Sequence, residues 1–181
     1  MSAHYEVRLS GSGGQGLLML GDILAEAAGN YENKELVLTK SYGPESRGGL
    51  CRSELIVDDI PINYPEVTRP DFVLALTQIS CDKYHRDMHP DGVLLVDPMF
   101  VRVIPGNVKN VYSIPLTEIA KNITGKEIAA NIAAAGAISV LSKFIRADSV
   151  RQAMRELFAK PFHEHNEKIF NAGAEAARAL L

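Results

Sequence analysis

A glycine-rich turn is the first place in this sequence where residue type and spacing indicate chemistry. Residues 11–16 read Gly-Ser-Gly-Gly-Gln-Gly, between an alternating segment at residues 5–9 and an apolar, helix-spaced segment at residues 17–28. Backbone N–H groups of such a turn, together with the dipole of the following helix, favour a phosphate. The pattern therefore predicts a site for a phosphate-bearing ligand. The candidate residues of this turn are Gly11, Gly13, Gly14, Gln15 and Gly16.

The same turn has two other interpretations. A nicotinamide site usually adds an Asp or Glu at the end of the second strand, where this sequence reads Thr39-Lys40-Ser41. Lys40 would suit a 2′-phosphate, so a free-standing NADP-binding or other nucleotide-binding protein stays an alternative. A turn that only lets a helix and a strand pack closely is the third interpretation.

A second candidate site lies in the loop at residues 41–49, which reads Ser-Tyr-Gly-Pro-Glu-Ser-Arg-Gly-Gly. Arg47 carries a planar guanidinium that suits a phosphate, and Lys40 and Arg52 flank the loop. Gly48 and Gly49 would allow a ligand or a neighbouring backbone to approach closely.

The alternative for this loop is a contact with another protein chain. Tyr42, Glu45 and Arg47 combine an aromatic ring with both signs of charge, which is typical of residues that fix the register of an interface. The sequence leaves both hypotheses open.

The other chemically capable residues predict neither a metal site nor a nucleophile. The two cysteines, Cys51 and Cys81, are too few for an iron–sulfur cluster or a structural zinc, and each is expected to be a buried apolar residue. His163 and His165 would point apart on a helix, and His85 and His89 have no evident third ligand. No catalytic residue is predicted.

Composition restricts the function further. The net charge of −3 and the pI near 6.0 give no broad positive field, so nucleic acid is not expected as a partner. No signal peptide and no membrane-spanning stretch is evident, which predicts a cytoplasmic protein. A length of 181 residues predicts a single domain covering residues 1–181.

The periodicity of apolar residues predicts a three-layer α/β/α, Rossmann-like domain with a mixed, mostly parallel sheet. A hairpin is expected between residues 50–57 and 60–63, with Asp58-Asp59 at its turn. Further strands are expected at residues 5–9, 35–39, 72–76, 93–96 and 111–114. Helices are expected at residues 17–28, 78–88, 116–120, 127–144, 149–158 and 164–181, with Gly136 allowing a close neighbour.

Three strings of residues resemble one protein family. They are the turn at residues 11–16, the loop at residues 41–49, and Pro61-Ile62 followed by Pro65. Together they resemble the gamma subunit, or gamma domain, of 2-oxoacid:ferredoxin oxidoreductases. The resemblance extends over nearly the whole chain, through residues 71–76, Asp97-Pro98, Ala130-Asn131 and Gly136.

Within that family, three further strings are most similar to the 2-oxoglutarate type, with the pyruvate and branched-chain types as relatives. These are residues 52–54, residues 62–65, and Thr77-Gln78 with residues 82–84.

The resemblance implies an enzyme that converts a 2-oxoacid and coenzyme A to an acyl-CoA and CO₂, and passes electrons to ferredoxin. It implies that thiamine diphosphate, magnesium and iron–sulfur clusters lie on alpha, beta and ferredoxin-like delta subunits, and that this chain binds none of them alone. It also implies a role for this chain in assembly and in contacting coenzyme A, with a pure assembly scaffold as the alternative. The shortage of cysteines agrees with that division, and the isolated chain is expected to be inactive.

Overall fold

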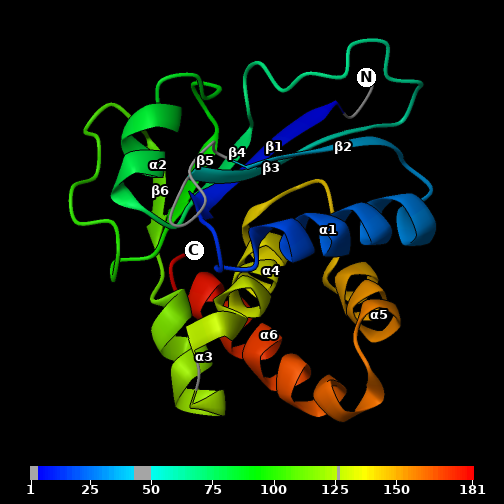
Figure 1. Cartoon of the computed structure of the whole chain (residues 1–181). Coiled ribbons are helices and arrows are strands. Elements are labelled where there is room, and N and C mark those ends of the chain that lie inside the picture. Colours follow the sequence, from blue (N-terminus) through cyan, green and yellow to red (C-terminus); the bar gives the residue numbers. More distant parts are fainter. Residues whose placement is uncertain (1–3, 43–49, 126) are drawn as a thin grey trace.

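The computed structural model describes residues 4–42, 50–125 and 127–181, and within these ranges the chain forms one six-stranded sheet with helices on both faces (Figure 1). The strands lie in the order β2-β3-β1-β4-β5-β6. Their bounds are β1 Tyr5–Ser12, β2 Glu35–Tyr42, β3 Leu50–Asp58, β4 Phe72–Ala75, β5 Val93–Val96 and β6 Asn110–Ser113. The helices are α1 Leu17–Glu32, α2 Gln78–Tyr84, α3 Leu116–Thr124, α4 Ala130–Leu141, α5 Ala147–Leu157 and α6 His163–Arg178.

Strand β3 runs antiparallel to both of its neighbours, β1 and β2. The pairs β1–β4, β4–β5 and β5–β6 are parallel. The prediction of a mixed, mostly parallel α/β sheet is therefore confirmed. Because β3 lies between β1 and β2, the connection through α1 passes over β3 before it reaches β2 (Figure 1).

The predicted hairpin after β3 is wrong, since residues 60–63 form no strand. The hairpin instead joins β2 to β3, in register from Glu35 opposite Asp58 to Tyr42 opposite Cys51. Strand β3 ends because the carboxylate of Asp58 accepts the N–H of Asp59 at 2.7 Å, and Pro61 then has no N–H to give to a ladder.

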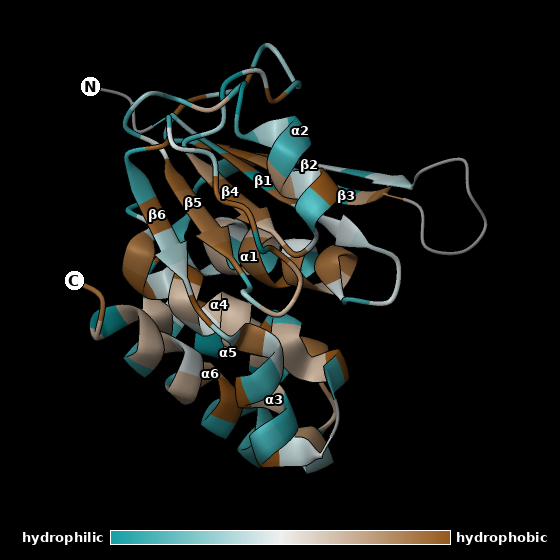
Figure 2. Ribbon diagram, turned by 90° about the vertical axis from the view of Figure 1, so that its left-hand side faces the viewer, coloured by the Kyte–Doolittle hydropathy of each residue, from teal (hydrophilic) through white to brown (hydrophobic). Residues whose placement is uncertain are grey.

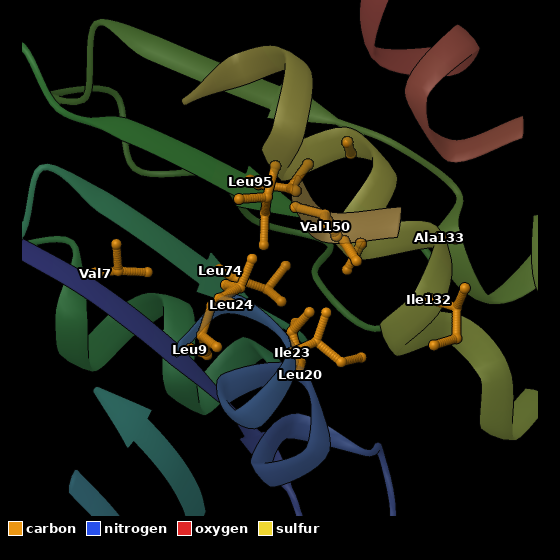
Figure 3. Close-up of a cluster of buried hydrophobic side chains, with 14 of the residues drawn as sticks. Val7, Leu9, Leu20, Ile23, Leu24, Leu74, Leu95, Ile132, Ala133 and Val150 are labelled. Carbon is orange, nitrogen blue, oxygen red and sulfur yellow. The ribbon is translucent and has the colours of Figure 1, made fainter. Parts of the chain in front are cut away.

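The two faces of the sheet are covered unequally. Helices α1, α3, α4, α5 and α6 lie on one side, and α2 lies on the other (Figures 1 and 2). The core on the larger side is built from alternate strand residues such as Val7 and Leu9, which meet Leu20, Ile23 and Leu24 of α1 (Figure 3). All five are fully buried, and each contributes roughly 1.5–3 kcal/mol through burial of its side chain.

Helices α4 and α6 cross at two glycines. A Cβ on Gly136 would lie 2.0 Å from the Phe170 carbonyl oxygen, and a Cβ on Gly173 would lie 2.1 Å from the Ala133 carbonyl oxygen. The expectation that Gly136 lets a neighbour approach closely is confirmed. This crossing fixes where the first turn of α6 lies relative to the first turn of α4, and both turns border the site described below. None of the described helices is long and apolar enough to cross a membrane.

We predict that Gly136→Ala lowers the free energy of unfolding by about 2–3 kcal/mol, because the added methyl group meets backbone atoms that have no rotamer to adopt. Gly106→Ala is the matched control, since a Cβ there meets nothing within 4 Å. Urea unfolding followed by circular dichroism measures both variants. Equal stabilities of the two variants would contradict the close helix crossing.

Candidate functional site

The glycine turn divides into residues that packing requires and residues that packing does not require. A Cβ on Gly11 would lie 2.3 Å from Oε1 of Gln15, and one on Gly16 would lie 2.6 Å from Nδ2 of Asn131. A Cβ on Gly13 or Gly14 would meet nothing within 4 Å. Gly14 and Gly16 have φ values of 95° and 74°, which favour glycine. Close packing therefore explains Gly11 and Gly16, whereas Gly13 and Gly14 border open space.

Gln15 holds the turn in place. Its side-chain Oε1 accepts the N–H of Ser12 at 2.7 Å, and its Nε2 donates to the carbonyl oxygen of Leu76 at 3.0 Å. Ser12 ends β1, and Leu76 directly follows β4. Strands β1 and β4 are parallel neighbours, and the chain leaves β1 toward one face of the sheet and β4 toward the other. Ligands of α/β folds commonly bind between two such strands, at their carboxyl ends. In this chain the side chain of Gln15 bridges the ends of the two strands through its two hydrogen bonds.

A pocket of about 530 Å³ opens beside the turn, on the α1 side of the sheet. Among the described residues, the starts of α1, α4 and α6 meet there, and the end of the β2–β3 hairpin contributes Tyr42 and Cys51. None of the described residues that line the pocket carries a charge. The volume is in the range of small-molecule sites. Gly13, Gly14, Gly16 and Tyr42 are thus the predicted site residues that the structure brings together.

Lys40 and Arg52 do not meet. Opposite residues of β2 and β3 share a face, and Lys40 is opposite Ser53 while Arg52 is opposite Ser41, so the two cations project from opposite faces. Nζ of Lys40 pairs with Oδ1 of Asp22 on α1 at 2.5 Å. Arg52 points to the α2 side. Glu45, Arg47, Gly48 and Gly49 lie outside the described residues.

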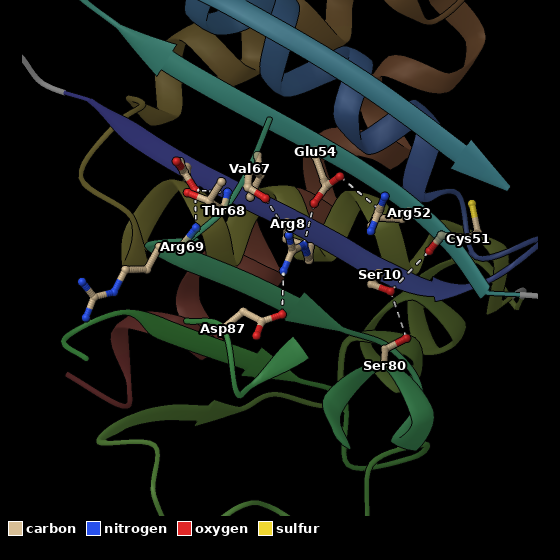
Figure 4. Close-up of polar contacts among 11 residues, drawn as sticks. Arg8, Ser10, Cys51, Arg52, Glu54, Val67, Thr68, Arg69, Ser80 and Asp87 are labelled. Atoms are coloured by element: carbon tan, nitrogen blue, oxygen red, sulfur yellow. Dashed lines mark hydrogen bonds and ion pairs between the residues drawn. The ribbon is translucent and has the colours of Figure 1, made fainter. Parts of the chain in front are cut away.

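A charged cluster on the α2 side of the sheet was missed in the sequence (Figure 4). Nε of Arg8 donates to Oε1 of Glu54 at 2.6 Å, and these residues are 5% and 8% exposed. Arg52 pairs with the other carboxylate oxygen of Glu54 at 3.0 Å. The Arg8 guanidinium lies 4.8 Å from the ring centre of Tyr84, and its Nη2 donates to the Val67 carbonyl oxygen at 3.0 Å. Arg52 is therefore committed to this cluster, away from the pocket.

The cysteines and histidines form no shared metal site in the described part of the chain. Cys51 borders the main core and Cys81 lies in the smaller core under α2, so the sheet separates the two thiols. No group of three or more metal-binding side chains occurs among the described residues. A ring nitrogen of His163 lies 2.7 Å from the Phe158 carbonyl oxygen, and one of His85 lies 2.9 Å from that of Cys81. Both rings have structural partners.

The topology also bears on the nicotinamide alternative. In a dinucleotide-binding fold, the strand after the first helix lies next to the first strand, which brings its carboxyl end to the ribose. Here the antiparallel strand β3 takes that position, and β2 lies one strand further out. The end of β2 carries Tyr42, with 71% of its surface exposed at the rim of the pocket. This arrangement does not favour NADP.

Comparison with known proteins gives consistent matches over nearly the whole chain. Residues 6–176 match the family described as pyruvate ferredoxin/flavodoxin oxidoreductase. The 2-oxoglutarate synthase subunit KorC of Methanocaldococcus jannaschii is 41% identical over 177 residues, which cover 97% of this chain and 95% of KorC. The gamma subunit of keto/oxoacid ferredoxin oxidoreductase from Geobacter sulfurreducens has a similar structure, with a TM-score of 0.87 and 42% identity over 98% of both chains.

A more distant structure shares the fold. It is the 2-oxoglutarate:ferredoxin oxidoreductase from Magnetococcus marinus, solved with 2-oxoglutarate, coenzyme A and succinyl-CoA bound. Its TM-score is 0.87 at 21% identity, and the match covers 98% of this chain and 32% of the longer one. The fold described above thus occurs both as a separate chain and as one part of a longer chain.

We predict that Glu54→Gln lowers the free energy of unfolding by about 3–5 kcal/mol, because it removes the close counter-charge of buried Arg8 and leaves it the exposed carboxylate of Asp87, 3.9 Å away. Asp22→Asn, which removes the partner of Lys40 in an exposed ion pair, should cost less than about 1 kcal/mol. Chemical unfolding compares the two variants. A small effect of Glu54→Gln would show that the cluster is not the buried ion pair described.

We also predict that both thiols react slowly in the folded chain. Burial raises the pKa of the Cys81 thiol to about 11 and also raises the pKa of the Cys51 thiol, so neither forms appreciable thiolate at pH 7.5. Titration with Ellman's reagent should detect the two cysteines only after unfolding in guanidinium. Rapid reaction of either thiol in the native chain would contradict this assignment.

Proposed function

The chain belongs to the pyruvate ferredoxin/flavodoxin oxidoreductase family, and from that premise we propose that it is the gamma subunit of an enzyme that acts on 2-oxoglutarate. The observation that carries the proposal is the 41% identity to a 2-oxoglutarate synthase subunit, over almost the full length of both chains. The matched lengths also make this chain equivalent to one subunit of such an enzyme, as the resemblance in the sequence predicted.

In the proposed complex, 2-oxoglutarate and coenzyme A are converted to succinyl-CoA and CO₂, and the two electrons released pass to ferredoxin. Thiamine diphosphate, magnesium and iron–sulfur clusters belong to alpha, beta and ferredoxin-like delta subunits. The positions of the cysteines support this assignment of the clusters to other subunits. The two cysteines of this chain lie on opposite faces of the sheet and cannot ligate one cluster. A cytoplasmic location remains part of the proposal.

The contribution of this chain is proposed to lie at the glycine turn and the pocket beside it. Two observations support this location. Gly13 and Gly14 leave space that packing does not need, and the first turn of α1 has no side-chain cap. Coenzyme A is the proposed ligand, because it is bound in a structure that contains this fold.

A contact with a partner subunit is the second candidate role for the same surface. Large apolar side chains at the rim of the pocket are unusually exposed, and such residues commonly mark an interface. They are Met19, Tyr42, Ile128 and Phe162. In this role the chain would be a pure assembly scaffold.

The test is anaerobic purification of the tagged chain from cells that express its complex, with mass spectrometry of the co-eluting chains. We expect larger subunits that carry iron and thiamine, and coenzyme A-dependent reduction of ferredoxin with 2-oxoglutarate. Depleting this chain should abolish most of that activity, and adding it back should restore the activity. Pyruvate and 2-oxoisovalerate serve as control substrates.

Two outcomes would contradict the proposal. One is elution of the chain alone with tight binding of NADP, which would favour a free-standing nucleotide-binding protein. The other is decarboxylation of an oxoacid, with reduction of ferredoxin, by the isolated chain.

A further inference from the structure

The crossover from β5 to β6 carries no helix. The two strands are parallel, and residues 97–109 join them without a helix or a strand. A parallel crossover is usually an α-helix, which covers the sheet on its own face. In this connection Val101 and Val108 pack into the smaller core, together with Cys81 and Tyr84 of α2. A single extended layer of chain therefore takes the place of a helix over this part of the sheet.

The whole α2 side of the sheet has a thin cover. Helix α2 is the one described helix on this side, and it is seven residues long, whereas the other side carries α1, α3, α4, α5 and α6 (Figures 1 and 2). Parallel strands of α/β folds are normally covered on both faces by helices. The described part of the chain supplies that cover fully on one face only, which leaves the α2 side open to a layer from another protein.

Large apolar side chains lie on the outside of this thin cover. Ile79 on α2 is 71% exposed, and Val103 in the β5–β6 connection is 68% exposed. Phe100 and Ile104 are exposed in the same connection. We call these four residues the α2-side patch. Exposed apolar side chains that gather on one surface commonly mark a contact with another protein.

The side chain of Gln78 fixes the α2-side patch. Its Oε1 accepts the backbone N–H groups of Arg102 and Val103 at 2.8 and 3.0 Å, and its Nε2 donates to the Val103 carbonyl oxygen at 2.8 Å. These three bonds tie the start of α2 to the middle of the β5–β6 connection. Ile79 and Val103 are thus held on adjoining segments before any partner binds. A surface that is already ordered loses little conformational entropy on binding.

Relatives of different length indicate the kind of partner. The ketoisovalerate oxidoreductase subunit VorA of Methanothermobacter thermautotrophicus is 33% identical over 95% of this chain, but the match covers only 36% of VorA. KorC is matched over 95% of its own length, so the rest of VorA has no counterpart in KorC. In a complex built from KorC-like chains, a separate and larger subunit would take the place of that additional stretch.

We propose that the α2-side patch is the docking surface for a larger subunit of the complex, and that the docked surface is apolar and uncharged. The inference rests on the proposed function and deepens it, because it names where the partner binds. The partner would supply the second layer that the β5–β6 connection leaves out. It would also remove Ile79 and Val103 from water, which is favourable by the apolar area buried.

Two double variants test the docking surface. Ile79→Ser/Val103→Ser removes the most exposed side chains of the patch. Ile60→Ser/Tyr64→Ser is the matched control, because these residues are 55% and 60% exposed but follow the end of β3, at the opposite edge of the sheet. Each protein is titrated anaerobically into complex that has been depleted of this chain. Reduction of ferredoxin with 2-oxoglutarate and coenzyme A reports how much complex has re-formed.

We expect the patch variant to need at least about tenfold more protein for half-maximal restoration, since side chains that anchor an interface commonly contribute that much. At saturation it should restore the full rate, because the patch holds the subunits together and takes no part in the reaction. The control variant should match the wild type. Melting temperatures should be unchanged, since the replaced side chains are exposed. Val103→Asp, a single change in a loop, gives the same test if the double variant is unstable.

Three results would overturn the inference. Equal half-maximal concentrations for the wild type and the patch variant would do so and leave the proposed function intact. A stable dimer of the isolated chain in analytical ultracentrifugation, dissolved by the patch variant while assembly of the complex is unchanged, would assign the patch to a second copy. Failure of the wild-type chain to restore any activity would contradict the proposed function itself, and this inference with it.

Discussion

The insertion of β3 between β1 and β2 is the constraint on which the arrangement of the site depends. Because β3 is antiparallel to both neighbours, the end of β2 and the start of β3 lie at the same edge of the sheet as the carboxyl end of β1. Tyr42 and Cys51 thereby arrive next to the glycine turn. The same register sends Arg52 to the opposite face, where it pairs with the carboxylate of buried Glu54, which also pairs with Arg8. One strand therefore separates an uncharged pocket from a charged cluster.

The glycine turn combines two roles that the sequence presented as alternatives. Gly11 and Gly16 allow the strand, the turn and α4 to pack at distances that a Cβ would prevent. Gly13 and Gly14 face open space, and Gln15 holds the turn so that this space persists. Packing on one side of the turn thus positions the open backbone on the other side. The close crossing of α4 and α6 then brings Asn131 and Asn166 to the same pocket.

Local patterns were enough to predict the strand–turn–helix unit and the family, because each rests on neighbouring residues. The mixed sheet was predicted correctly, but from a hairpin at residues 60–63 that does not form. The partner of β3 was not predictable in this way, since alternation at residues 50–57 identifies a strand but not its neighbour. The Arg8–Glu54 pair depends on a register between segments 46 residues apart. Asn166 gave no signal, because its position at the pocket follows from the packing of α6 on α4. The charges of Lys40 and Arg52 were recognised, but their separation onto two faces required the hairpin register.

The central claim is that this subunit meets its ligand on the α1 side of the sheet, where three helices begin among the described residues. Hydrogen–deuterium exchange of the assembled complex, with and without coenzyme A, tests it most directly. The account predicts slower exchange at Leu17, Leu18 and Met19 when coenzyme A is present, with no change in β3 around Arg52 and Glu54. Slower exchange confined to the charged face of β1 and β3, with the start of α1 unaffected, would contradict it.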